Sequence, residues 1–393
     1  MKRSAIGLFM LLLGLAPYFV VGQDKAVYQV DSVETSNLER FSNMIIDSVN
    51  NGYPQIVIDH LSMENFFAEL WSQLDSTSIA HIPSTDIENI KMYFEKDLKK
   101  SIFPFPDDVV DNIGWIGNYW SESDRPHLIY RYVSGGSFGY FDLELLRNGD
   151  TFSVADVFVF STSSYLSTVM KSILESTVQY GSSDPRVNVQ IGFTNAVKNE
   201  SYAEATNLYN QLTEKEQDYG FNCIQHVKAL ALQNRNKEAL DAAKFFIKKD
   251  SSNIATYMLL LSIYDSLKEY SKCLETVNSI DKLIGGDIFL NYQRAVLNRK
   301  MNNAVRFVAF AKQVMQDMPT YQKMHHQLIN EALELKDAGA MMDILEAYSS
   351  NFYVTPEVMG NIKANASFMK DNPRYIEWIK EKTLEYENWV NPQ

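Results

Sequence analysis

Between residue 186 and residue 389, apolar positions return every 34 residues along the chain. Three columns of positions show this period: first Ala205, Ala239, Cys273, Phe307, Met341 and Tyr375; four residues later Tyr209, Ala243, Val277, Ala311, Leu345 and Ile379; three residues later again Leu212, Phe246, Ile280, Val314, Tyr348 and Lys382. Offsets of four and three place the columns on one face of an α-helix. The pattern therefore predicts six repeats of helix pairs, at 186–219, 220–253, 254–287, 288–321, 322–355 and 356–389.

This repeat resembles the tetratricopeptide repeat (TPR), a 34-residue unit of two antiparallel helices. Tyr202 and Ala205 match the Tyr and Ala positions of that unit, Tyr270 matches the Tyr again, and Pro319 matches the Pro that closes a repeat. The resemblance covers 186–389. It implies an all-α TPR solenoid of about six helix pairs whose first helices line a concave groove, and such a groove suits an extended or helical peptide.

In this family, positions 2, 5, 9 and 12 or 13 of each first helix usually point into the groove. Here those positions give Gln190, Thr194, Lys228, Met258, Ser262, Asp265, Tyr292, Arg299, Lys300, His326 and Asn330. The resemblance implies partner binding by five of them: Lys228, Tyr292, Arg299, His326 and Asn330. Some members clamp a C-terminal carboxylate with Lys or Arg at position 5 and Asn at position 9. Only the fifth repeat comes close, with His326 and Asn330, so that specificity is not expected here.

The first half of the chain has a different pattern. Apolar residues spaced three and four apart predict helices over 35–51, from Pro54 to Leu74 and over 85–100. Beyond Asn112 the period becomes two, which predicts strands over 115–121, 128–133, 138–146 and 152–160, followed by a closing helix over 165–180. Asn148-Gly149 indicates a type I′ hairpin. The expected fold is an α+β domain at 23–180 with a four-stranded antiparallel sheet, and its element order loosely resembles the NTF2/cystatin-like folds.

The N-terminus has the pattern of a secretory signal: Lys2-Arg3, an apolar run from Ile6 to Val21, and a small-residue exit at Gly22. The apolar run is shorter than the roughly 20 residues of a spanning helix. Cleavage after Gly22 would export the protein to the periplasm or outside the cell, as in a bacterium. An uncleaved signal that anchors the chain in the membrane is the alternative.

Charge is distributed unevenly between the two halves. The formal net charge is −13, and residues 23–185 hold 24 acidic and 10 basic residues, whereas residues 186–393 hold 25 acidic and 24 basic ones. Binding to nucleic acid requires a positive surface, so this distribution argues against a nucleic-acid partner. A protein partner with a basic patch would suit the acidic half.

Few side chains suggest catalysis or metal binding. The Gly135-Gly136 segment leads into a strand, so it is expected to be a hairpin turn and not a phosphate loop. Asp156 is expected to share a strand face with Val154, Phe158 and Phe160, where a carboxylate is costly unless it is paired. Arg131 could supply the charge. Cys223 and Cys273 are expected to be buried, reduced thiols, and the six His residues show no metal-ligand spacing.

The sequence thus favours an exported, non-enzymatic protein that binds a peptide or protein partner through its repeats, without a cofactor. Two alternatives stay open. One is an enzyme with a pocket around Asp156 in the N-terminal domain, for which the repeats recruit substrate. The other is a groove occupied by the protein's own N-terminal domain.

Overall fold

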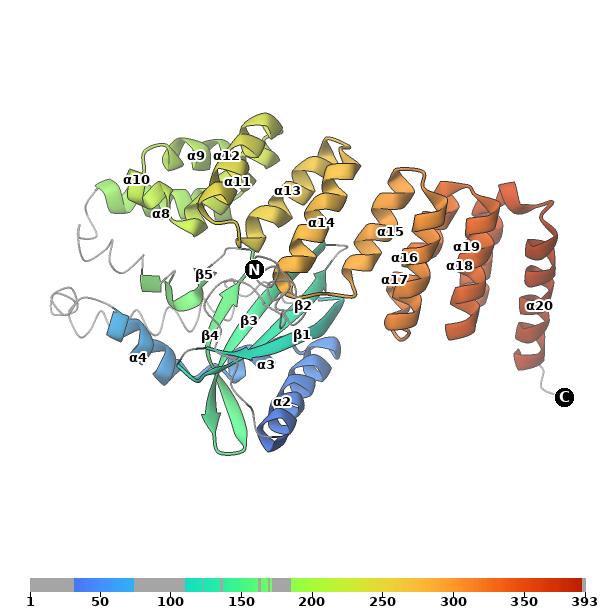
Figure 1. Ribbon diagram of the computed structural model, residues 1–393, viewed down its shortest axis with the longest axis horizontal. Helices are drawn as coiled ribbons and strands as arrows, with labels where there is room; N and C mark the ends of the chain where they lie inside the picture. The colour runs from blue at the N-terminus through green and yellow to red at the C-terminus, as the bar shows by residue number, and fades with distance from the viewer. Residues whose placement is uncertain are drawn as a thin grey trace, which may run out of the picture. The chain divides into compact units, whose positions relative to one another are not determined.

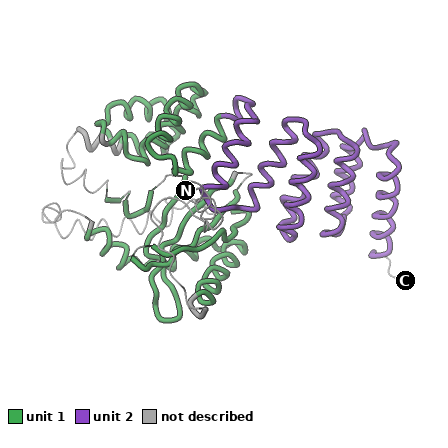
Figure 2. The backbone as a smooth tube through the Cα atoms, viewed as in Figure 1, with its two compact units in different colours: residues 1–263 green, residues 264–393 purple. Residues whose placement is uncertain are grey.

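The computed structural model describes residues 32–73, 110–121, 123–134, 137–161, 164–168, 170–171 and 185–390 (Figure 1). The chain divides into two compact units, residues 1–263 and 264–393, and the division falls inside helix α13 (Figure 2). The predicted signal segment, the predicted helix over 85–100 and most of the predicted helix over 165–180 lie outside the described residues. Within the described part of the chain, no helix has the length and hydrophobicity needed to cross a bilayer.

An antiparallel sheet forms the part of unit 1 that precedes the helical repeats. Its strands follow chain order: β1 (Asn112–Trp120), β2 (Pro126–Ser134), β3 (Ser137–Asn148), β4 (Thr151–Val159) and β5 (Ser164–Tyr165). The four predicted strands are therefore present in the predicted meander. The count of four was too low, because the two-residue strand β5 pairs with the end of β4. So short a strand leaves almost no period-two signal in the sequence.

One face of the sheet carries the core of this region. Leu128, Tyr130, Phe141 and Leu143 are fully buried there, and helices α2 (Ser32–Asn50), α3 (Ile56–Asp59) and α4 (Met63–Gln73) pack against them. Helix α2 confirms the predicted helix over 35–51.

The helix predicted from Pro54 to Leu74 is two helices with a break between them. Around Leu61 the backbone turns to β4 instead: the Ser62 amide donates to the Val154 carbonyl at 2.8 Å, and the Val154 amide donates to the His60 carbonyl at 2.7 Å. These bonds replace intrahelical ones, so the helix cannot continue through this point.

The β3–β4 hairpin also differs from its prediction. Its loop residues are Gly149 and Asp150, because Asn148 pairs with Thr151. Of the two, Gly149 has a positive φ of 64° and Asp150 does not. A positive φ at the first position alone is typical of a type II′ turn, so the type I′ prediction was one residue out of phase.

The rest of unit 1 is helical. It contains α8 (Pro185–Lys198), α9 (Tyr202–Tyr209), α10 (Glu214–Gln217), α11 (Gly220–Leu232), α12 (Asn236–Lys249) and the greater part of α13 (Ile254–Ser266). Ala205 packs with Phe193, Leu212 and Ala229 in one apolar cluster, and Phe246 packs with Ile224 and Ala255 in another. Helix pairs are thus joined through the predicted columns.

Unit 2 continues the helical pattern. It contains α14 (Tyr270–Ile284), α15 (Leu290–Lys300), α16 (Ala304–Asp317), α17 (Gln322–Leu335), α18 (Ala338–Asn351), α19 (Pro356–Asn365), the short 3-10 helix η2 (Ser367–Met369) and α20 (Pro373–Val390). Its first-column residues Cys273, Phe307 and Met341 are 0% exposed, and Tyr375 is 7% exposed. The first column is therefore buried in each of these pairs, whether the residue is small or large.

The turn between the two helices of a pair repeats with the same 34-residue period. Five of these turns hold a non-glycine residue with a left-handed backbone and φ between 56° and 59°: Glu200, Asn234, Lys268, Asn302 and Lys336. At Asn302 the amide donates to the Arg299 carbonyl at 2.8 Å, and the next amide donates to the Asn298 carbonyl at 2.8 Å. This is the Schellman arrangement, which satisfies the last carbonyls of a helix. In the sixth pair, Lys370 has φ −52° and follows η2, so this pair departs from the pattern.

Candidate functional site

The strongest candidate surface lies on the first helices of unit 2, namely α15, α17 and α19, and on the end of α13. We call it the first-helix face and define it by Asp265, Tyr292, Arg299, Lys300, His326, Asn330, Glu331 and Asn361. Six of these eight residues stand at the positions where the sequence predicts the groove. The other two, Glu331 and Asn361, stand at positions 10 and 6 of their repeats.

Side-chain contacts connect each first helix of this face to the next. Lys300 Nζ on α15 donates to Asp265 Oδ1 on α13 at 2.5 Å, and Asn361 Nδ2 on α19 donates to Asn330 Oδ1 on α17 at 3.2 Å. Between them, Arg299 on α15 forms an ion pair with Glu331 on α17. These contacts bridge residues about 31 to 35 apart in sequence. The face is therefore a continuous polar strip across neighbouring repeats.

Tyr292 lies beside this strip on α15 and is half-buried. Its ring packs against Phe289 with centroids 5.6 Å apart. Burial raises the pKa of the Tyr292 hydroxyl, and the nearby charge of Glu331 raises it further. The hydroxyl is thus neutral and able to donate a hydrogen bond. A half-buried aromatic ring with a polar tip is a common contact residue at protein interfaces.

His326 and its neighbour His325 point in different directions from α17, as expected for adjacent helical residues. His325 is fully buried, and its Nε2 donates to the Met318 carbonyl at 3.0 Å. His326 is half-buried and lies 2.8 Å from the Tyr348 hydroxyl on α18. Burial lowers the pKa of both imidazoles. His326 is therefore neutral at pH 7 and offers polar contacts without charge.

The five predicted binding residues are divided between the two units. Tyr292, Arg299, His326 and Asn330 all belong to the first-helix face in unit 2. Lys228 is exposed on α11, in unit 1. The sequence also did not single out Glu331, Tyr348 and Asn361 as contact residues. Glu331 directly follows the predicted Asn330, but its contact with Arg299 of the preceding repeat depends on how α15 and α17 pack, and the repeat pattern alone does not give that packing.

Asp156 in β4 is buried, but its surroundings differ from the prediction. A β-bulge at Ala155 places Asp156 opposite Glu144 and Val154 opposite Leu145. Because a bulge adds one residue, it reverses the alternation of faces. Val154 and Val157 therefore face the apolar core, and Asp156 lies on the other face. The prediction that Asp156 and Val154 share a face was wrong for this reason.

The partner of Asp156 is Ser167 and not Arg131. The Ser167 hydroxyl donates to Asp156 Oδ2, and the Val157 amide donates to Asp156 Oδ1 at 2.7 Å. Arg131 extends toward β1, where its guanidinium lies beneath Gly114; a Cβ at Gly114 would stand 2.5 Å from Arg131 Nη2. With 4% exposure and both oxygens hydrogen-bonded, Asp156 is placed as a structural carboxylate.

A second buried carboxylate on the same face is held in a similar way. Asp142 Oδ2 accepts a hydrogen bond from the Tyr119 hydroxyl at 2.5 Å, and Asp142 Oδ1 lies 3.1 Å from His127 Nδ1. The rings of Tyr119 and His127 stack with centroids 4.4 Å apart. This network links β1, β2 and β3 and was not predicted. Among the described residues, no cluster of three or more His, Cys, Asp or Glu could hold a metal ion.

Comparison with known proteins adds little. No family model matches the chain, and no curated protein matches it. One solved structure, titled MamA MSR-1 C2, is similar over 42% of this chain and 94% of its own length, with 12% identity and a TM-score of 0.34. Similarity at this level supports no conclusion about fold or function, so the description of the helical array depends on its own 34-residue recurrence.

Proposed function

We propose that this protein is an exported, non-enzymatic interaction protein of the TPR class, and that it binds a peptide or protein partner on the first-helix face. The class is supported by the 34-residue recurrence of helix pairs, buried columns and left-handed turns. The function is supported by one observation above all: polar side chains of α13, α15, α17 and α19 form a strip across successive first helices.

The chemistry of the strip suits recognition of a polypeptide. Arg299 and Glu331 supply charges of both signs, Asn330 supplies an amide with donor and acceptor, and Tyr292 adds an aromatic ring with a polar tip. Main-chain amides and carbonyls of a peptide can be satisfied by groups of this kind.

A variant pair tests the function. Asn330→Glu places a charge on the exposed part of the first-helix face, whereas Val305→Glu places the same charge at an 81% exposed position on the second helix α16. Tagged wild-type and variant proteins would be used to enrich binding proteins from the exporting compartment. The proposal predicts proteins retained by wild type and by Val305→Glu but lost with Asn330→Glu. Equal retention by both variants would place binding elsewhere.

Export is the second part of the proposal and has its own test. Signal peptidase should cut after Gly22, so the intact mass of the exported protein should lack residues 1–22. Exported protein that retains Met1 would instead be a membrane-anchored form.

A further inference from the structure

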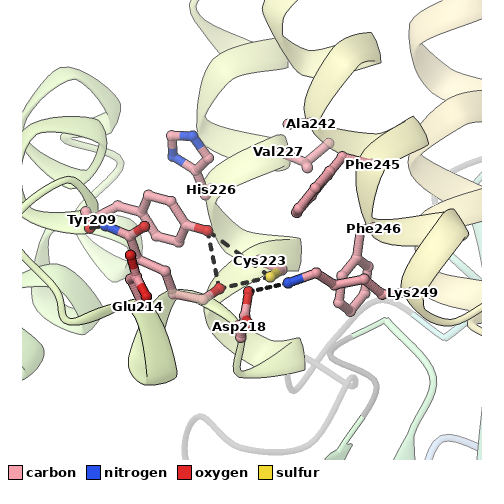
Figure 3. A pocket seen from close by; sticks show the side chains of 11 residues that line it. Tyr209, Glu214, Asp218, Cys223, His226, Val227, Ala242, Phe245, Phe246 and Lys249 are labelled. Carbon is pink, nitrogen blue, oxygen red and sulfur yellow. Dashed lines mark hydrogen bonds and ion pairs between the residues drawn. The ribbon is translucent and has the colours of Figure 1, made fainter.

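A pocket in unit 1 follows from a shortened helix. α9 has 8 residues, whereas the second helices α12, α14, α16 and α18 have 14 or 15. After Tyr209 the chain turns into the single helical turn α10. A capping box holds α10 in place, with Thr213 Oγ1 accepting from the Glu216 amide at 3.3 Å and the Glu216 carboxylate accepting from the Thr213 amide at 2.8 Å. The resulting pocket has a volume of about 330 Å³ and is lined by α9–α12 (Figure 3).

Aromatic rings line two sides of this pocket. On one side, Tyr209 stacks on His226 with ring centroids 3.8 Å apart and an angle of 6° between the planes. Figure 3 shows Phe245 on the other side. Phe245 is 59% exposed, so its ring is open to solvent and accessible to a ligand. Val227, Ala242 and Phe246 add apolar lining on the Phe245 side (Figure 3).

The pocket has a polar end with fixed groups. Lys249 Nζ donates to Asp218 Oδ1 at 2.5 Å. The Tyr209 hydroxyl and the Cys223 thiol both donate to the Gln217 carbonyl, at 3.0 Å and 2.8 Å. These bonds hold the walls in place before any ligand arrives. Burial lowers the pKa of His226 to about 4, so the stacked wall is uncharged at neutral pH.

We infer that this pocket binds an aromatic side chain with a hydrogen-bond donor, tryptophan or tyrosine, from a peptide segment of a partner. Lys249 Nζ lies 4.8 Å from the centroid of the Phe245 ring, so this side of the pocket already holds a cation against an aromatic ring. Aromatic groups on two sides of the pocket favour a flat ring over a branched aliphatic group. The Asp218 carboxylate, 57% exposed, can accept a hydrogen bond from an indole N–H or a phenol. The pocket shares no residue with the first-helix face. Binding in the pocket can therefore be disproved without affecting the proposed function, and the proposed function can be disproved without affecting the pocket.

The test uses the full exported chain and Cys223 as reporter. Cys223 is half-buried in the pocket, whereas Cys273 is buried, and mass spectrometry of peptides distinguishes the two sites. The rate of Cys223 alkylation by iodoacetamide would be measured with acetyl-Gly-Trp-Gly-amide, acetyl-Gly-Leu-Gly-amide or free tryptophan. We expect saturable protection by the tryptophan peptide, about threefold or more at millimolar concentration, and much less by the other two.

Variants make the result specific to the pocket. Ala242→Phe fills the pocket and should abolish saturable protection, whereas Asp241→Phe, at the exposed neighbouring position, should retain it. Phe245→Ala removes one wall at a largely exposed position and should weaken protection about fivefold. Equal protection by the leucine peptide, protection by free tryptophan alone, or protection that survives both Ala242→Phe and Phe245→Ala would overturn the inference.

Discussion

At the scale of single residues, buried polar groups show the most specific chemistry. Asp156 is 4% exposed, and loss of water around it raises the pKa of its carboxyl to about 7, from an ordinary value of 3.8. Hydrogen bonds from Ser167 and Val157 lower the pKa but do not offset the burial. The carboxyl is therefore partly protonated at neutral pH in the folded protein.

This shift predicts how stability depends on pH. An unfolded chain loses the Asp156 proton near pH 4, whereas the folded chain keeps it until about pH 7. Between those values the folded state binds more protons, so its free energy of unfolding falls as pH rises. The full loss is about 4 kcal/mol. The Asp156→Asn variant has an amide at this position that cannot ionise. Its free energy of unfolding should therefore rise relative to that of wild type between pH 5 and pH 8.

Urea unfolding followed by tryptophan fluorescence, to which Trp115 and Trp120 in β1 contribute, measures this difference. Asp150→Asn is the matched control, because Asp150 is exposed at the β3–β4 turn. Its stability should follow the wild-type pH profile. If the Asp156→Asn profile also runs parallel to wild type, the buried carboxyl does not have the raised pKa.

At the scale of elements, the sequence predicted the helices of the repeated pattern well. It predicted less well where backbone hydrogen bonds between distant segments determine where a helix ends or which face of a strand a residue occupies. The columns through Ala239 and Phe307 located every helix pair. Burial of one helix face requires apolar residues three and four apart, and the 34-residue recurrence of that spacing marks each pair. Backbone bonds between His60–Ser62 and Val154 broke a predicted helix, and the bulge at Ala155 turned Asp156 to the other face. Neither event changes the hydrophobic pattern, so the sequence alone could not show it.

The first-helix face was predicted in part for the same reason. Tyr292, Arg299, His326 and Asn330 were found from their positions in the repeat. Their contact partners were not, because Glu331 and Asn361 lie at positions that depend on how neighbouring helices pack. The pocket beside Tyr209 was missed because the residues after the end of α9 still follow the apolar columns, with Leu212 buried.

The repeated left-handed turns give a prediction about stability. Lys336 has φ 56°, a conformation that costs a residue with a Cβ about 1 kcal/mol relative to glycine. Lys336→Gly should therefore raise the free energy of unfolding by up to about 1 kcal/mol. Gln313→Gly, at an exposed position in the middle of α16, should lower it by a similar amount. Thermal melts followed by circular dichroism compare the two. Destabilisation by both would contradict a left-handed requirement at Lys336.

At the scale of the whole molecule, charge is the main asymmetry. Residues 23–185 carry a net charge of −14 and residues 186–393 a net charge of −1. A field of this size steers a partner of opposite charge toward the protein more than it tightens the final complex. The alternative is that the acidity only keeps an exported protein soluble.

Association kinetics distinguish these two explanations. If the acidic half attracts a basic partner, the association rate should fall steeply as the screening length shrinks from about 30 Å at low salt to about 8 Å at physiological salt. Asn330→Ala should mainly raise the dissociation rate, because it changes the first-helix face and not the field. Stopped-flow mixing across a salt series measures both. An association rate that does not change with salt would show that the acidic half has no part in recognition.

Site-specific photo-cross-linking tests the central claim, binding on the first-helix face, most directly. A photoreactive phenylalanine analogue would replace Asn330 on α17 in one protein and Val305 on α16 in another, both at exposed positions of unit 2. Irradiation in the exporting compartment, followed by mass spectrometry, identifies what lies within reach of each site. We predict a discrete cross-linked protein from position 330 and none from position 305. Cross-linking from position 305 with none from position 330 would contradict the proposal that first helices form the binding surface.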